Sequence, residues 1–322
     1  MGGGITRAPA FFFSLLAIRS MYLLFTRKKS LDIFLTAIFS ALTILFHPEA
    51  AIHTLAAALV FFIVFGRNKS GFLRSIAVIA YTMIFTSPWW LTIITRHGFK
   101  PFLTAGSTGF YNLSSYISFF TFNLTNESGV SSIAVLGLLG LFIYLSQKKL
   151  LFPFWLMATF LIEPRSAPLH ISTPLTVMAA TTLISITRNF DKRCKDIRGP
   201  NGEISPFQSF ISKSLLILLL IQWNISAISK AVEVISESTI KQADLDAIAW
   251  VKANTDEDSS FLILTGLRPF RDPVSEWFPA LSQRSSIATV QGYEWKSDIN
   301  FDEVLLNSNA LQKCLVGVTY FL

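Results

Sequence analysis

The chain has 322 residues, of which 52% are hydrophobic and 15% are charged, and its formal net charge is +7. Soluble domains carry about 25% charged residues, so this deficit favours a membrane protein. The positive charges lie at the ends of apolar segments rather than along a stripe with exposed aromatic residues, which argues against a nucleic-acid-binding protein.

Eight apolar segments are candidates for membrane-spanning helices. A helix needs roughly 20 apolar residues to cross the hydrocarbon core, with a lower limit of about 17. In chain order the segments are Ala8–Phe25, Leu31–Phe46, Ala50–Gly66, Ser75–Thr95, Gly129–Ser146, Leu150–Ile162, His170–Thr187 and Ser214–Ile228. The sixth is short and would need a locally thinned bilayer. The pattern predicts an α-helical polytopic membrane protein of about eight spans.

Clusters of cations follow every second segment. They are Arg27, Lys28, Lys29, then Arg67, Lys69, Arg74, then Lys148, Lys149, and finally Arg188, Lys192, Arg193, Lys195 and Arg198. The connections at the other ends carry few cations. Because cationic loops stay on the cytoplasmic side, the chain is predicted to be a multi-pass protein of the cell membrane. Everything after about Ser229 then lies outside the cytoplasm.

The last part of the chain has a different pattern, with short apolar runs between polar breaks. Asp244–Val251 has apolar residues at helical spacing, whereas Phe261–Leu264 and Ser286–Val290 resemble buried strands. We therefore predict two domains. Residues 1–229 form a transmembrane helical domain, and residues 230–322 form a small, incomplete extracytoplasmic α/β domain.

The first apolar segment is followed by its cations, whereas a signal peptide or signal anchor carries them in front. We therefore expect this segment to run from outside to inside. We also expect the chain to be the middle or C-terminal part of a longer membrane protein. An intact protein with its N-terminus outside the cell is the alternative.

Ionisable side chains gather at the helix ends that are predicted to lie outside. Glu49 and His53 are four residues apart and share one face of the third segment. Glu163 and Arg165 lie in the turn after the sixth. They predict an outward-facing crevice for an anionic substrate, in which Arg165 pairs with a phosphate and Glu163 orders Arg165 or acts as acid or base. The alternative is that all four are ordinary residues of interfacial turns.

The common motifs of soluble enzymes are absent from the sequence. It contains no Gly-rich phosphate loop, no His-Glu-x-x-His and no Gly-x-Ser-x-Gly. It also lacks a C-x-x-C pair, and no metal site is predicted. The sequence does not identify a cofactor, and a divalent metal is one candidate.

Three stretches carry a resemblance to a known family. They are Leu45–Ala51 with its His-Pro turn, Leu161–Ala167, and Ala249–Thr255 followed by Phe261–Gly266. Together with the many spans and the small outer tail, they resemble the GT-C superfamily of membrane glycosyltransferases. The most similar group is that of bacterial membrane proteins related to the aminoarabinose and mannosyl transferases.

The resemblance implies transfer of a sugar from a polyprenyl-phosphate-linked donor at the outer face of the membrane. The expected partners are this donor and membrane lipids, with no nucleic acid. The family's catalytic acid lies in an outer loop after its first span, and nothing before Ala8 can supply it. The catalytic residue is therefore unknown and is expected upstream of this chain. The substrate-binding candidates, drawn from this sequence alone, are Glu163, Arg165, Glu49 and His53.

Two other functions stay open. A transporter or flippase usually places polar groups near the middle of the membrane, whereas the charges here lie at outer helix ends, apart from Arg19. A non-catalytic membrane protein would instead bind a partner through its outer domain. Trp277–Pro279 and Tyr293–Trp295 would then form the contact patch.

Overall fold

The computed structural model describes residues 4–107, 132–164, 166–196, 206–238, 240–267, 272–287, 289–290, 292–293 and 299–313. The chain divides into two compact units. The helical unit comprises Thr6–Thr92 and Gly109–Gln222, and the tail unit comprises Met1–Ile5, Ile93–Thr108 and Trp223–Leu322. The predicted domain division between residues 229 and 230 stays a prediction.

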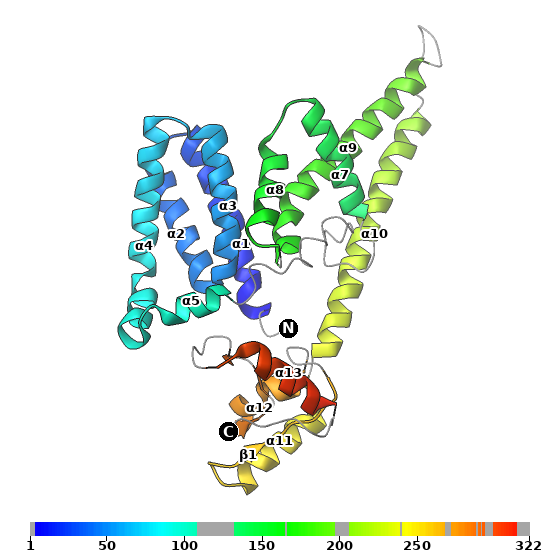
Figure 1. Ribbon diagram of the computed structural model, residues 1–322. Coiled ribbons are helices and arrows are strands. Elements are labelled where there is room, and N and C mark those ends of the chain that lie inside the picture. Colours follow the sequence, from blue (N-terminus) through cyan, green and yellow to red (C-terminus); the bar gives the residue numbers. More distant parts are fainter. Residues whose placement is uncertain are drawn as a thin grey trace. The chain divides into compact units, whose positions relative to one another are not determined.

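Helices occupy all eight apolar segments (Figure 1). They are α1 (Gly4–Thr26), α2 (Ser30–Phe46), α3 (Pro48–Phe65), α4 (Lys69–His97), α7 (Ser132–Ser146), α8 (Leu151–Ile162), α9 (Ala167–Asp196) and α10 (Pro206–Ser238). The short α5 (Lys100–Ser107) was not predicted. Helix α9 extends to Asp196, beyond the predicted segment His170–Thr187, because no Gly or Pro interrupts the chain between Pro174 and Gly199.

Four of the described helices are long and apolar enough to cross a membrane, which indicates a membrane protein. Their spans are Thr6–Thr26, Pro48–Phe65, Lys69–His97 and Ala167–Asn189. Helices α2, α7 and α8 and the apolar part of α10 are shorter. The predicted total of about eight spans therefore stays a prediction.

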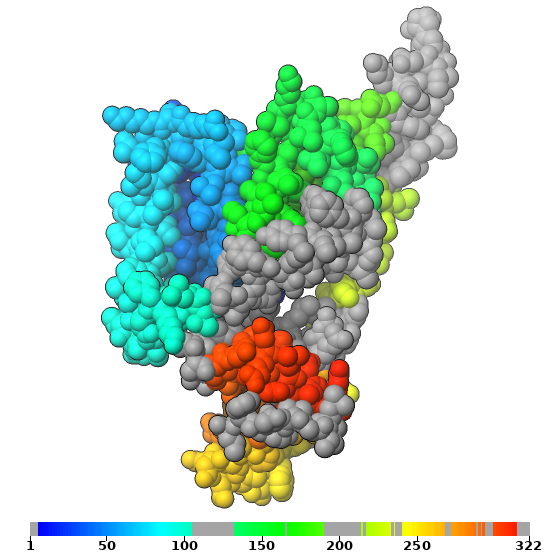
Figure 2. Space-filling view, in the orientation of Figure 1, coloured from blue at the N-terminus to red at the C-terminus, as the bar shows by residue number. Residues whose placement is uncertain are grey.

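The outer surface of α4 is apolar along most of its length. Exposed side chains on it include Phe72, Leu73, Ile76, Ile79, Met83 and Ile84. Helix α4 forms cyan surface at one edge of the helical unit in Figure 2. Only 11% of the most apolar 18-residue stretch of α4 is buried inside the protein. An apolar surface of this length is a liability in water, whereas lipid tails would cover it in a bilayer.

Helix α8 joins the two apolar clusters of the helical unit. Its Trp155 contacts Phe61 of α3 and belongs to a cluster that also includes residues of α1, α2 and α4. Its Leu156 and Phe160 pack instead with residues of α7 and α9. Although α8 has only 12 residues, it is held on both sides. These two sets of contacts hold the end of α8, which Glu163 follows directly.

Helices α7 and α9 approach each other closely through two glycines. A Cβ atom on Gly137 would overlap the Leu175 side chain, and one on Gly140 would overlap the carbonyl oxygen of Met178. Small residues allow this approach of backbones between helices in a membrane. The contact fixes the position of α9, which begins at the candidate site described below.

The tail unit contains three helices and two very short strands among its described residues after α10. They are α11 (Gln242–Asn254), β1 (Ser260–Phe261), α12 (Pro273–Ser282), β2 (Ser285–Ser286) and α13 (Phe301–Gln312). The strands pair in parallel, Ser260 with Ser285 and Phe261 with Ser286. The predicted helix over residues 244–251 is confirmed, whereas α12 and α13 were not predicted.

The strands are shorter than the apolar runs predicted because a side chain takes over the backbone bonds after β1. The Gln312 amide donates to the carbonyl oxygen of Ile263 over 2.8 Å. Its Oε1 accepts from the N–H groups of Thr265 and Gly266, each over 3.1 Å. One glutamine from α13 thus replaces a neighbouring strand. An α/β domain of the predicted kind stays a prediction.

Candidate functional site

The turn between α2 and α3 brings two polar side chains to one end of the helical unit. His47 alone separates the helices and has an extended backbone, with φ −160° and ψ 104°. Pro48 starts α3, where its fixed φ and missing N–H are tolerated. Glu49 lies in the first turn, where a carboxylate interacts favourably with the helix dipole. The local sequence thus dictates a tight reversal that carries His47 and Glu49.

Arg7, near the start of α1, joins these two residues. Its Nη2 lies 3.6 Å from Oε2 of Glu49, and its Nε lies 3.3 Å from Nε2 of His47. The same His47 nitrogen lies 3.0 Å from Oε2 of Glu49. Two separate helix ends therefore supply an outer cluster of Arg7, His47 and Glu49, centred on the carboxylate.

The proton of His47 can be assigned from this geometry. One ring nitrogen cannot accept a hydrogen from Arg7 and donate one to Glu49 at the same time. The shorter contact is with the carboxylate, so we place the proton on Nε2, which donates to Glu49. Arg7 then interacts with Glu49 through its ion pair. The Arg7 side chain is 44% exposed, which leaves it accessible to a ligand.

A cavity of about 170 Å³ opens onto the outer cluster. Its lining residues are Arg7, His47, Glu49, Ala50, Ser166, Pro168, Leu169 and His170. Liquid water takes about 30 Å³ per molecule, so the cavity has room for about six waters or one small polar group. A guanidinium, a carboxylate, two imidazoles and a hydroxyl surround this space. They suit a ligand that combines negative charge with hydroxyl groups.

An inner cluster consists of His53 from α3, Glu163 after α8, and Ser166 before α9. Nε2 of His53 lies 3.1 Å from Oε2 of Glu163 and 2.7 Å from Oγ of Ser166. The backbone N–H of Ser166 donates to the same Glu163 oxygen over 2.9 Å, and its hydroxyl also donates to it. Since Ser166 also lines the cavity, it links the inner cluster to the ligand space.

The Glu163 carboxylate is stabilised in its charged form. Burial raises the pKa of this carboxyl, since only 3% of the residue is exposed. The hydrogen bonds from the His53 side chain and from the hydroxyl and backbone N–H of Ser166 lower the pKa by more. The net pKa therefore lies below the ordinary value for glutamate. Glu163 is ionised at neutral pH and has its donors already in place.

His53 has one ring nitrogen in use and one without a partner. Its Nε2–H is the donor to Glu163, because a carboxylate accepts only. Nδ1 is buried and has no hydrogen-bond partner among the described residues. A Ser-His-acid triad needs the serine and the acid on opposite ring nitrogens, whereas Ser166 and Glu163 contact the same nitrogen here. The inner cluster is therefore not a nucleophilic triad.

A pair of stacked histidines joins the inner cluster to the cavity, which His170 lines. The rings of His53 and His170 lie 4.1 Å apart between centroids, with an interplanar angle of 23°. Phe11 from α1 contacts the His170 ring edge-on, with a centroid separation of 5.7 Å. The stacked rings join α3, which carries His53, to the start of α9, which carries His170.

The structure brings together three of the four site residues predicted from the sequence. Glu49 lines the cavity, whereas His53 and Glu163 form the inner cluster. Arg165 lies outside the described residues. Sequence reasoning missed Arg7, although a lone cation at the predicted outer end of the first apolar segment was an available signal.

The described side chains give no obvious metal site. No group of three or more His, Cys, Asp or Glu residues in the described ranges is arranged to hold an ion. Within those ranges, Arg7 is the cation best placed for an anionic cofactor or substrate, because it lines the cavity and is accessible.

Comparisons with known proteins assign no function to the site. The chain matches no protein-family model, no curated protein and no solved structure.

Proposed function

We propose that this chain carries the substrate site of a membrane glycosyltransferase that uses a polyprenyl-phosphate-linked sugar. The observation that supports it most is the polar cavity at the ends of apolar helices, where Glu49 lies between Arg7 and His47. A lipid-linked sugar presents the matching groups, a phosphate and several hydroxyls, at the membrane surface.

Each side chain of the outer cluster has a role in this proposal. An acceptor hydroxyl attacks the anomeric carbon, a new carbon–oxygen bond forms, and the bond to the phosphate oxygen breaks. Glu49 takes the proton of the acceptor hydroxyl, and Arg7 stabilises the negative charge on the departing phosphate. His47 orients the Glu49 carboxylate through its hydrogen bond.

Glu163 has a different role from Glu49. One of its oxygens already accepts bonds from His53 and from two groups of Ser166. Glu163 is only 3% exposed and is not among the residues that line the cavity, so we assign it to positioning Ser166 and His53. Glu49 also accepts from Arg7 and His47, but it is partly exposed and lines the cavity, so we assign the acid–base role to Glu49 on the ground of access.

The proposal includes a topology. All eight apolar helices cross the membrane, the cavity faces the outside, and the tail unit forms an outer α/β domain. The supporting observation is charge: the basic turns at Arg27–Lys29 and Arg67–Lys69 follow α1 and α3, whereas Arg7 and Glu49 lie at the starts of these helices. Cation-rich ends remain in the cytoplasm.

The experiment reconstitutes the chain in liposomes with polyprenyl phosphates that carry a labelled aminoarabinose, mannose or glucose. Release of the sugar to water or to an added membrane extract is measured, together with donor binding. We expect Glu49→Gln to lower the rate by about 100-fold with donor still bound. Arg7→Ala should weaken donor binding and also lower the rate.

Arg19→Ala is the matched control, because Arg19 lies on the same helix and does not line the cavity. Equal activity in Arg7→Ala, Arg19→Ala and the unchanged chain would contradict the proposal. Passage of the intact labelled donor across the bilayer without sugar release would instead identify a flippase.

A further inference from the structure

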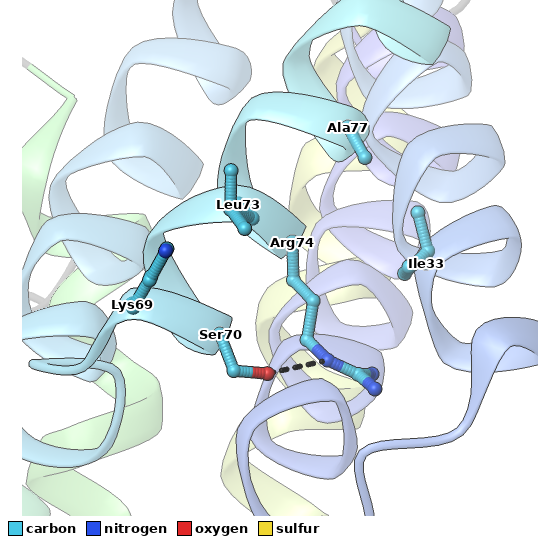
Figure 3. Close-up of a pocket in the computed structure, with 6 residues that line it drawn as sticks. All are labelled: Ile33, Lys69, Ser70, Leu73, Arg74 and Ala77. Carbon is cyan, nitrogen blue, oxygen red and sulfur yellow. Dashed lines mark hydrogen bonds between the residues drawn. The ribbon is translucent and has the colours of Figure 1, made fainter.

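A groove lies between α2 and α4 at the opposite end of the helical unit from the candidate site. Its volume is about 540 Å³, and it is lined by Ile33, Lys69, Ser70, Leu73, Arg74 and Ala77. Figure 3 shows that Ile33 comes from α2 and that the other five lie along the start of α4. None of the lining side chains is acidic.

Polarity changes along this groove in one direction. Lys69 and Ser70 lie in the first turn of α4 and are exposed, Leu73 and Arg74 lie one turn further on, and Ala77 follows. A helix rises about 1.5 Å per residue, so Lys69 and Ala77 are about 12 Å apart along the axis. The groove therefore has a cationic end at the helix start and an apolar end deeper in the bundle.

Arg74 organises the cationic end. Its Nη1 donates to the carbonyl oxygen of Lys29 over 3.2 Å, and its Nη2 donates to that of Lys28. Its Nε donates to Oγ of Ser70 over 3.3 Å (Figure 3). Lys28 has a positive φ of 59°, a strained conformation that the Arg74 bond helps to hold. The guanidinium has further N–H donors that can bind an anion.

The neighbouring turns add more positive charge. Arg27, Lys28 and Lys29 after α1 and Arg67 after α3 are exposed. Phe25 at the end of α1 lies against Gly66, the residue that ends α3, so the two turns are adjacent. Asp32 is the one acidic residue in the sequence from Arg7 to Pro48, and it is buried. The electrostatic potential at this end of the helical unit is therefore strongly positive.

We propose that this groove binds one anionic phospholipid of the surrounding membrane. The headgroup phosphate lies against Lys69, Ser70 and the available N–H groups of Arg74. One acyl chain lies along Leu73, Ala77 and Ile33. A phospholipid has the same order of charge and apolar surface, and basic pockets between membrane helices are a common setting for its headgroup. This inference depends on insertion in a membrane and is independent of the proposed catalysis.

The test is native mass spectrometry of the chain released from detergent micelles. The probes are dioleoyl-phosphatidylglycerol, dioleoyl-phosphatidylcholine and inorganic phosphate, each titrated separately. We expect one molecule of phosphatidylglycerol to be retained in preference to phosphatidylcholine. Lys69→Ala should weaken this binding about five-fold, as expected for one cation at a membrane surface.

Two matched controls separate the groove from general effects of charge and lipid contact. Lys149→Ala removes a cation from another predicted cytoplasmic turn and should leave binding unchanged. Leu73→Ser should weaken binding, whereas Ile76→Ser changes an exposed residue of the same helix that does not line the groove. All four positions are exposed or partly exposed, so the variants should fold.

Each outcome of the titration supports or overturns the proposed lipid site. Equal losses in Lys69→Ala and Lys149→Ala would show only general electrostatic attraction and would overturn the site. Equal retention of the two lipids would also overturn it. Competition by inorganic phosphate as effective as that by the lipid would identify a soluble anion as the ligand. Lipid binding is read without catalysis, so this result is independent of the glycosyltransferase assay.

Discussion

Nε2 of His53 lies 3.1 Å from Oε2 of Glu163, although 110 residues separate them in the sequence. The two residues are 2% and 3% exposed. An ionised carboxylate is costly to bury unless hydrogen-bond donors surround it. The pair therefore ties α3 to the turn between α8 and α9, and it holds Ser166 at the edge of the cavity.

The two stacked histidines should differ in their contribution to stability. His53→Phe removes a donor from a buried carboxylate and should lower the free energy of unfolding by about 2 kcal/mol or more. His170→Phe keeps a ring stacked in place and should cost less than about 1.5 kcal/mol. Titration with sodium dodecyl sulfate, followed by circular dichroism, measures both. Equal losses would show that the His53–Glu163 bond contributes nothing beyond packing.

Stability should depend on pH through Glu163. Its folded-state pKa lies below the unfolded value of about 4.3. The stabilisation is therefore fully present above that value and is lost as pH falls through the folded pKa. Thermal unfolding of the chain and of Glu163→Gln, measured from pH 7 to pH 3, should show a difference that shrinks as pH falls. A constant difference would mean that the charge of Glu163 is irrelevant.

A larger residue at Gly140 should separate α7 from α9. A side chain there meets the backbone of Met178, which cannot rotate away. Gly140→Leu should therefore destabilise the fold by about 3 kcal/mol, at the upper end of the range for overpacked cores. Val135→Leu is the control, since Val135 lies on the same helix and is 45% exposed. Thermal unfolding in detergent gives the comparison, and equal midpoints would show that α7 and α9 do not pack closely.

Single cysteines should label from opposite sides of the membrane. With Cys194 and Cys314 replaced by Ala, a cysteine at Lys28 should react only after the membrane is made permeable. A cysteine at His47 should react with an impermeant maleimide added to whole cells. These positions lie at opposite ends of α2. Labelling of both from the same side would refute the proposed orientation.

Several features of the fold were predictable because they depend on local sequence. Apolar segments and the tight turn at His47–Pro48 predicted helices α2 and α3 to within two residues at each end. The strands after α11 were over-predicted. The Gln312 side chain binds the backbone after β1 from a distance of 47 residues, and no local pattern indicates this.

The candidate site was likewise predictable only in part. Glu49, His53 and Glu163 stood out as polar residues at apolar helix ends. Their division into an outer cluster with a cavity and a buried inner cluster could not be predicted. It depends on which helix ends are adjacent in space, and Arg7 joins Glu49 only because α1 packs beside the α2–α3 turn.

The sequence alone determined the long apolar helices, the alternation of cationic turns and the polar residues at the other helix ends. Hydrophobic periodicity and charge placement are local properties, and the solvation of each segment depends on its own composition. Tertiary structure decided that Glu163 accepts hydrogen bonds from His53 and Ser166, that Glu49 faces a cavity with Arg7, and that Arg74 organises a groove. Each of these depends on distances between residues far apart in the chain, which only the packing of helices sets.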